Sequence, residues 1–218
     1  FLDNLSPGAP ALNGVNGALN AVLDWALVQN GWAIEYTATN ARVYRAGSGN
    51  RFRLHVRHDS AITTDACYAY VRGCETATSA TAIGSLFPTA AQVVNSWSTW
   101  AAGEQYNPGA SVDYRLIVGT TFVILLIKED GNASASWGYY FFGDVTKTRA
   151  ADVWNTAITV RNGNTPGTSY SGAMGSISAV GFAGAAPSTA KWFWCRSIDG
   201  VTKSTLGGMQ ALYSSVLQ

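Results

Sequence analysis

The stretch VDYRLIVGTTFVILLIK, residues 112–128, decides the fold class of this 218-residue chain. Its two arms are rich in β-branched and aromatic residues, and Gly119-Thr120 between them is typical of a turn. The stretch therefore predicts a β-hairpin with arms at 112–118 and 121–128. The second arm is apolar at every position from 122 to 127, whereas a strand with one wet face alternates. We expect that arm in the middle of a sandwich or beneath a neighbouring protein.

Short segments of strand character extend outward from this hairpin on both sides. Turn residues such as those at 47–50 separate them. The clearest alternation is at 51–58, where Phe52, Leu54 and Val56 share one face. Arg51, Arg53, His55 and Arg57 share the other, which predicts a half-buried antiparallel strand with a wet basic face. Further strands are predicted at 32–37, 42–45, 66–74, 137–142, 157–161, 177–182 and 191–196.

Helical spacing occurs near the N-terminus. Apolar residues there recur at steps of mostly three or four, at Leu12, Val15, Leu19, Val22, Leu23, Ala26 and Leu27. Gly31 is well placed to end a helix, because glycine tolerates a positive φ. The pattern predicts a helix over 12–30, with its firm part starting nearer Ala18 because Gly14 and Gly17 weaken the first turns. A shorter helix is expected within 87–97.

Together these segments predict a mainly β protein, an antiparallel β-sandwich or barrel-like domain with one N-terminal α-helix. Neither an internal repeat nor a long linker divides the sequence, so residues 1–218 are expected to form a single domain. Within it, the helix occupies 12–30, strands fill 31–200, and 201–218 is a C-terminal segment.

The composition excludes several classes of protein. Only 12% of residues are charged, against about 25% in an average soluble domain. The 14 basic and 13 acidic residues give a net charge of +1, without the basic excess of a nucleic-acid binder. A hydrophobic fraction of 47% argues against disorder, and no apolar run is long enough to predict a membrane span. A surface with so few charges is typical of a subunit covered by neighbours or of an exported protein, and the alternative interpretation is a neutral soluble enzyme.

Catalytic motifs are missing from the sequence. It contains neither a Gly-x-Ser-x-Gly elbow nor a phosphate-binding Gly-rich loop, and no Cys-x-x-Cys. Its 13 acids are too scattered to assign a carboxylate pair. We therefore predict no catalytic residues, no cofactor and no enzymatic activity.

Cysteine and histidine offer few candidates for metal binding. Cys67 and Cys74 lie seven residues apart and face opposite ways on a regular strand; a disulfide would require a break at Gly73, and reduced, packed thiols are the simpler interpretation. His55 and His58 also face opposite ways, and a metal would need further ligands such as Asp59 or Asp65. We predict no metal site and interpret both histidines as surface residues of the basic strand.

Two groups of residues are candidates for binding a partner. Arginine is concentrated between 42 and 57, where it favours either docking on an acidic partner or a solvated face balanced by acids elsewhere. The eight tryptophans and their aromatic neighbours favour a buried core, a protein interface or stacking on sugar rings. The predicted partner-binding residues are Arg51, Arg53, Arg57, Trp137 and Tyr139.

An ordered series of motifs covers about half of the chain. It starts with Trp32, continues through ARVYRAGSGNRFRL at 41–54, AYVRGCET at 69–76 and FPT at 87–89, and ends with DYRLIVGTTFVIL at 113–125 and WGYYFFGDV at 137–145. In this order the motifs resemble a group of tailed-bacteriophage virion structural proteins. The helix before Gly31-Trp32 fits the same group, whereas the C-terminal third departs from it.

The resemblance implies an accessory, non-enzymatic virion protein. Its partners would be other virion proteins of the capsid or tail and further copies of itself, and its location would be the virion. Capsid decoration and a tail or collar role are both consistent with it, and neither direct nucleic-acid contact nor a membrane span is expected. Two alternatives remain from other classes: a carbohydrate-binding module that attaches the virion to a host glycan, and a hydrolase that uses the scattered acids.

Overall fold

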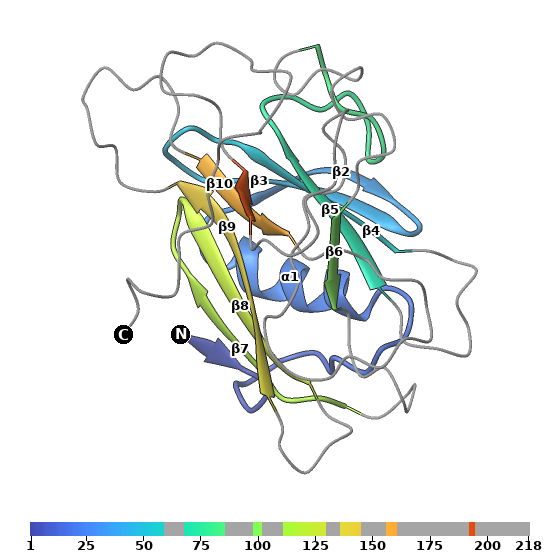
Figure 1. The fold of residues 1–218 in the computed structure, drawn as a ribbon, viewed down its shortest axis with the longest axis vertical. Coiled ribbons are helices and arrows are strands. Elements are labelled where there is room, and N and C mark those ends of the chain that lie inside the picture. Colours follow the sequence, from blue (N-terminus) through green and yellow to red (C-terminus); the bar gives the residue numbers. More distant parts are fainter. Residues whose placement is uncertain are drawn as a thin grey trace.

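The computed structural model describes residues 1–58, 68–85, 98–101, 111–129, 136–144, 156–160 and 192–194. Within these ranges the chain forms one helix and eleven strands, arranged in two antiparallel sheets that pack as a sandwich. Figure 1 shows the sheets crossing at an angle, with the helix near the place where they approach each other. The predicted fold class, mainly β with one N-terminal helix, is confirmed.

One sheet has six described strands in the order β1-β7-β8-β9-β10-β11, and we call it the six-stranded sheet. The predicted hairpin is at its centre, where Val118 pairs with Val123 and the Gly119 N–H donates to the Phe122 carbonyl over 2.9 Å. The strand bounds are β1 Leu2–Asp3, β7 Tyr114–Val118, β8 Phe122–Glu129, β9 Ser136–Asp144, β10 Thr156–Val160 and β11 Trp192–Trp194.

The second sheet, which we call the five-stranded sheet, follows chain order from β2 to β6. Its strand bounds are β2 Ala33–Ala38, β3 Ala41–Arg45, β4 Arg53–His58, β5 Tyr68–Cys74 and β6 Ser98–Ala101. The short strands β1 and β6 have no counterpart in the sequence prediction. Outside the described residues lie the predicted strand at 177–182, the predicted short helix at 87–97 and the C-terminal segment at 201–218.

The helix is shorter than the predicted 12–30. Helix α1 spans Ala18–Val28, and Gly17 before it has φ +89°, which separates residues 12–16 from the helix. Leu12 instead forms a β-bridge with Val112. At the other end the prediction holds: Gly31 has φ +85°, its N–H donates to Val28, and the Trp32 N–H donates to Leu27, the pair of bonds in a Schellman motif.

The core lies between the two inner sheet faces and is closed by one side of α1. Phe142 of β9 joins the layers, because its ring stacks on Phe52 at 5.8 Å and meets Trp32 at 6.1 Å. The Trp32 indole N–H also donates to the Gly119 carbonyl over 2.8 Å, which links the end of α1 to the hairpin turn. Other core side chains are Leu19, Leu23, Tyr44, Leu54, Val71, Tyr114, Leu116 and Leu125.

A second junction joins the loop after β3 to the far sheet. The Ser48 N–H donates to the Thr120 carbonyl over 3.2 Å, and the Asn50 N–H donates to the Asp144 carboxylate over 2.8 Å. Gly49 lies so close that a Cβ there would clash with the same carboxylate. Its φ of +67° also favours glycine, so both the backbone and the contact with the six-stranded sheet favour glycine at position 49.

Among the described residues, no helix has the length and apolar character that crossing a membrane requires.

Candidate functional site

The predicted wet basic face of β4 is wrong. Strand β4 lies inside its sheet, paired to β3 on one side and to β5 on the other. Leu54 and Val56 point into the core as expected. On the opposite face His55 is fully buried, and Arg53 and Arg57 are only half-exposed. The alternation in the sequence identified the two faces correctly, but the outer face is covered as well as the inner one.

A β-bulge explains how the arginines of this face are neutralised. The register between β2 and β3 shifts between Ile34 and Tyr36, which leaves Glu35 as the extra residue. A bulge re-aims a side chain, and here the Glu35 carboxylate accepts two hydrogen bonds from Arg53, at 2.7 Å and 2.9 Å. Arg45 approaches the same carboxylate at 3.7 Å. Glu35 therefore forms ion pairs with both Arg45 and Arg53.

Electrostatic effects follow this geometry. The hydrogen bond and charge of Arg53 lower the pKa of Glu35, and the same contact raises the pKa of Arg53. Arg53 also donates to the Glu75 carbonyl, and Arg42 pairs with Asp24 of α1 at 3.3 Å. Arg42, Arg45 and Arg53 are thus held by acids of this chain, which corresponds to the balanced interpretation of the arginine cluster, although the face is part-buried rather than solvated.

Both histidines are buried, so their predicted surface location is wrong. Burial lowers the pKa of His55 to about 3, helped by the charges of Arg72 and Arg53. Burial likewise lowers the pKa of His58 to about 4, with Arg42 adding to the shift. Both imidazoles are therefore neutral at pH 7. Strand β4 carries the only two histidines of the sequence.

The structure separates the predicted binding residues. Arg51 is exposed and lies before β4, with φ +55°. Arg53 is engaged with Glu35, and Arg57 is half-buried opposite Ala41 and Tyr70. Trp137 and Tyr139 lie on the other sheet, at the β9 positions opposite Lys128 and Leu126; their side chains are outside what the structure describes. The five residues do not form one site.

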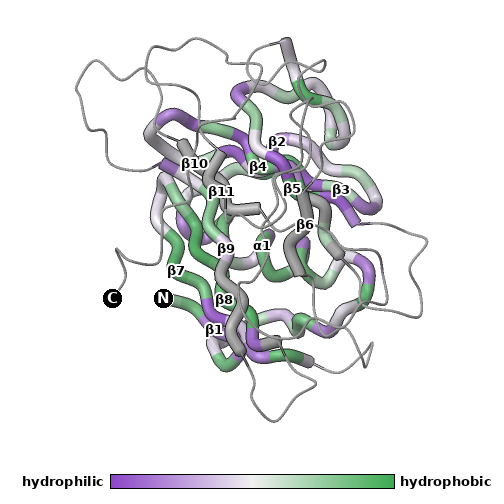
Figure 2. Tube along the Cα trace, in the orientation of Figure 1, coloured by the Kyte–Doolittle hydropathy of each residue, from purple (hydrophilic) through white to green (hydrophobic). Residues whose placement is uncertain are grey.

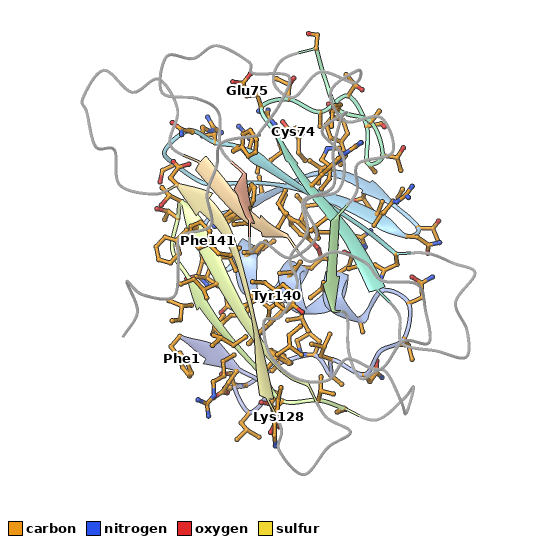
Figure 3. All side chains as sticks on the ribbon, in the orientation of Figure 1. Phe1, Cys74, Glu75, Lys128, Tyr140 and Phe141 are labelled. Atoms are coloured by element: carbon orange, nitrogen blue, oxygen red, sulfur yellow. The ribbon has the colours of Figure 1, made fainter. Side chains whose placement is uncertain are left out.

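The outer face of the six-stranded sheet is apolar instead. Across its central strands Ile117 pairs with Ile124, and Ile124 pairs with Phe141. Ile117 is 42% exposed, and the other two are half-exposed. Leu126 and Phe122 extend this row along β8. We call Ile117, Phe122, Ile124, Leu126 and Phe141 the outer apolar face. Figure 2 shows hydrophobic residues along β7 and β8, and Figure 3 shows Phe141 on the outward side of β9, opposite Tyr140.

This surface was signalled by the run of apolar residues at 122–127, which the sequence analysis placed inside a sandwich or under a neighbour. Strand β8 lies inside the sandwich on one of its two sides only. Val123, Leu125 and Ile127 are buried in the core, whereas the alternate residues face outward. Individual members of the outer apolar face were not predicted as binding residues, because periodicity does not tell which side of a two-sided apolar strand meets solvent.

Cys74 is a free, fully buried thiol, and burial raises its pKa to about 12. Reduced packing, the simpler of the two sequence interpretations, therefore holds for Cys74; Cys67 and Cys195 lie outside the described residues. In the part of the chain that the structure describes, no group of three or more His, Cys, Asp or Glu side chains is arranged to hold a metal ion. Asp59 and Asp65 also lie outside that part.

Comparisons with known proteins add no relative: no protein-family model, no curated protein and no solved structure matches this chain.

Proposed function

We propose that this chain is a non-enzymatic structural component of a tailed-phage virion that binds other virion proteins, as a capsid decoration protein or as a tail or collar accessory protein. The outer apolar face carries the proposal. Single exposed apolar side chains are common on soluble proteins, whereas a contiguous apolar patch, such as the one that Ile117, Ile124 and Phe141 form, is typical of a surface that a partner covers. The low overall charge is consistent with the same interpretation.

The resemblance to virion proteins supports the choice of assembly. Its motifs fall on described strands of both sheets: 41–54 covers β3 and the start of β4, 69–76 covers most of β5, and 113–125 covers β7 and the first half of β8. The motifs that carry the resemblance are therefore the strands that build the sandwich. The outer apolar face of this sandwich is the described feature that favours binding of a protein partner.

Purified virions of the phage that encodes the chain provide the test. Cryo-electron microscopy, or immunogold labelling with an antibody against the chain, is expected to place it on the particle in multiple copies. Density on the capsid lattice would indicate decoration, and density on the tail or neck would indicate an accessory tail role. Absence of the chain from purified virions would overturn the proposal.

Attachment to a host glycan is the second candidate. Residues 137, 139 and 141 of β9 are all aromatic, and alternate positions of a strand belong to one face. A row of aromatic rings is a common platform for stacking sugars. A glycan array would show specific binding that Trp137→Ala abolishes if this function is correct. An array without binding would leave these aromatics as interface or packing residues.

A further inference from the structure

The outer apolar face continues to the edge of the six-stranded sheet. Leu2 pairs with Leu116, which places Phe1 at the register position next to Ile117. Phe1 is 75% exposed, and Figure 3 shows it on the outward side of β1. Ile117, Ile124 and Phe141 thus make one row across β7, β8 and β9, and Phe1, the residue before β1, extends it. Such a row has the width of an interface rather than that of a single exposed side chain.

Charged residues flank this row at one end, and their signs are balanced. Arg115 is exposed and pairs in register with Asp3 on one side and with Leu126 on the other. One step further, Lys128 lies 3.4 Å from Asp113. Two acids and two bases therefore border the apolar row. A border of mixed sign can pair with a copy of itself when the acids of one copy meet the bases of the other, whereas docking on a basic or an acidic partner favours a single sign.

We infer that the outer apolar face binds a second copy of this chain, face to face, in a two-fold symmetric pair. A two-fold interface uses the same patch on both subunits, which requires a patch that complements itself. In this arrangement the apolar rows cover each other and the charged ends pair across their border. The inference rests on the proposed function and names one partner of that binding surface.

The size of the face sets the strength to expect. The strands β1, β7, β8 and β9 that form this face are spaced by about 4.8 Å and rise by about 3.3 Å per residue, so they offer about 400 Å² per copy and about 800 Å² per pair. That area is in the range of weak, transient interfaces. We therefore expect a pair that forms at about micromolar concentrations and dissociates on dilution.

Sedimentation velocity over a dilution series of the full chain tests the inference. The wild type is expected to shift from monomer to dimer as concentration rises from about 1 to about 100 μM. Ile117→Lys places a charge in the row and is expected to weaken dimerisation by about tenfold or more. Ile34→Lys is the matched control, because Ile34 is an isoleucine of similar exposure, 37% against 42%, on the edge strand of the other sheet. It is expected to leave dimerisation unchanged.

Arg115→Glu provides a second variant that does not depend on the apolar row. Arg115 is exposed, so its replacement is expected to leave folding intact, as the far-ultraviolet circular dichroism spectrum would show. Each copy of this variant then has three acids and one base at the border of the row, so the two copies repel each other and we expect weaker dimerisation. Added salt screens this repulsion and is expected to restore part of the affinity.

A wild type that stays monomeric at about 100 μM would overturn the inference and assign the face to a different protein or to another segment of this chain. Dimers weakened equally by Ile34→Lys and Ile117→Lys would overturn it as well. The proposed function fails separately: a dimer in solution that is absent from virions contradicts the virion role alone, and a monomer that is present on virions contradicts only the self-association.

Discussion

The outer faces of the two sheets reverse the usual distribution of residues. On the five-stranded sheet the outer face carries Arg53 and His55, and it is largely buried, with Val43 fully covered as well. On the six-stranded sheet the outer face carries Ile117, Ile124 and Phe141, and it is partly open to solvent. Charged side chains are partly enclosed where acids of the chain neutralise them, and apolar side chains are partly exposed on the face that we propose binds a partner.

This difference gives the low charge of the chain a structural meaning. Arg45 and Arg53 are held by Glu35, and Arg42 is held by Asp24. Part of the already small set of charges is therefore engaged inside the chain rather than spread over its surface. What remains at the centre of the six-stranded sheet is an uncharged surface, which is the composition of an interface core.

Acid is expected to act first on the five-stranded sheet, and this is the largest effect we predict. The unfolded chain protonates each histidine near pH 6.5, whereas folding lowers the pKa of His55 to about 3 and of His58 to about 4. Between these values the unfolded state binds more protons, so the free energy of unfolding falls as the pH drops below 6.5. At pH 5 the loss is about 2 kcal/mol per histidine, or about 4 kcal/mol in total.

Urea unfolding at pH 7 and pH 5 measures this loss. The double variant His55→Gln, His58→Gln is the control, since it keeps polar side chains at both positions and removes both titrations. Its free energy of unfolding is expected to change little between the two pH values, whatever its absolute stability. An equally steep fall in the double variant would assign the acid sensitivity to other groups and contradict the burial of the histidines.

Neighbouring leucines on β8 compare the two sides of the six-stranded sheet directly. Leu125 is fully buried in the core, so Leu125→Ala is expected to lower the free energy of unfolding by about 3 kcal/mol. Leu126 belongs to the outer apolar face and is half-exposed, so Leu126→Ala is expected to cost less than about 1 kcal/mol in the monomer. Chemical denaturation of both variants at low protein concentration gives the two values. Equal losses would show that the outer face is already covered within one chain.

The same two faces show how far the sequence could predict this protein. The hairpin, the strands at β3, β4 and β9, and the end of the helix at Gly31 followed from periodicity and turn residues, which are local properties. The burial of His55 could not be predicted, because alternation separates the two faces of a strand without indicating what covers each face. The role of Glu35 was missed for a related reason: a bulge depends on the pairing between strands, and no residue type in β2 indicates it.

The start of the helix illustrates a second limit. Leu12 and Val15 continue the apolar spacing of α1, so periodicity extends the helix to position 12. In the structure Gly17 has φ +89°, and Leu12 bridges to Val112 in the distant hairpin. Apolar spacing alone therefore extends the helix too far, whereas the local signal of Gly14 and Gly17, which places its firm start nearer Ala18, is confirmed.

Removing one acid from each sheet compares an enclosed ion pair with an open one. Glu35→Gln leaves Arg45 and Arg53 close together without their shared carboxylate, and we expect a loss of about 1–2 kcal/mol in the free energy of unfolding. Asp113→Asn is the matched control on the six-stranded sheet, because the pair of Asp113 with Lys128 is more open to solvent. Its loss is expected to stay below about 0.5 kcal/mol. Thermal or urea unfolding at pH 7 distinguishes the two, and similar losses would contradict the special role of the bulge.

Arg51 lies in the loop between β3 and β4, which contacts the six-stranded sheet. Its replacement is expected to change the free energy of unfolding least. Its φ of +55° is costly for a residue with a side chain, so Arg51→Gly removes strain. Glycine also gives the unfolded chain more freedom, which offsets part of that gain. We expect a net stabilisation of up to about 1 kcal/mol by urea unfolding. Arg51→Ala keeps the strained backbone while removing the guanidinium, and it should stay within about 0.5 kcal/mol of the wild type. If Arg51→Ala and Arg51→Gly were equally destabilising, the guanidinium itself would hold the junction between the sheets.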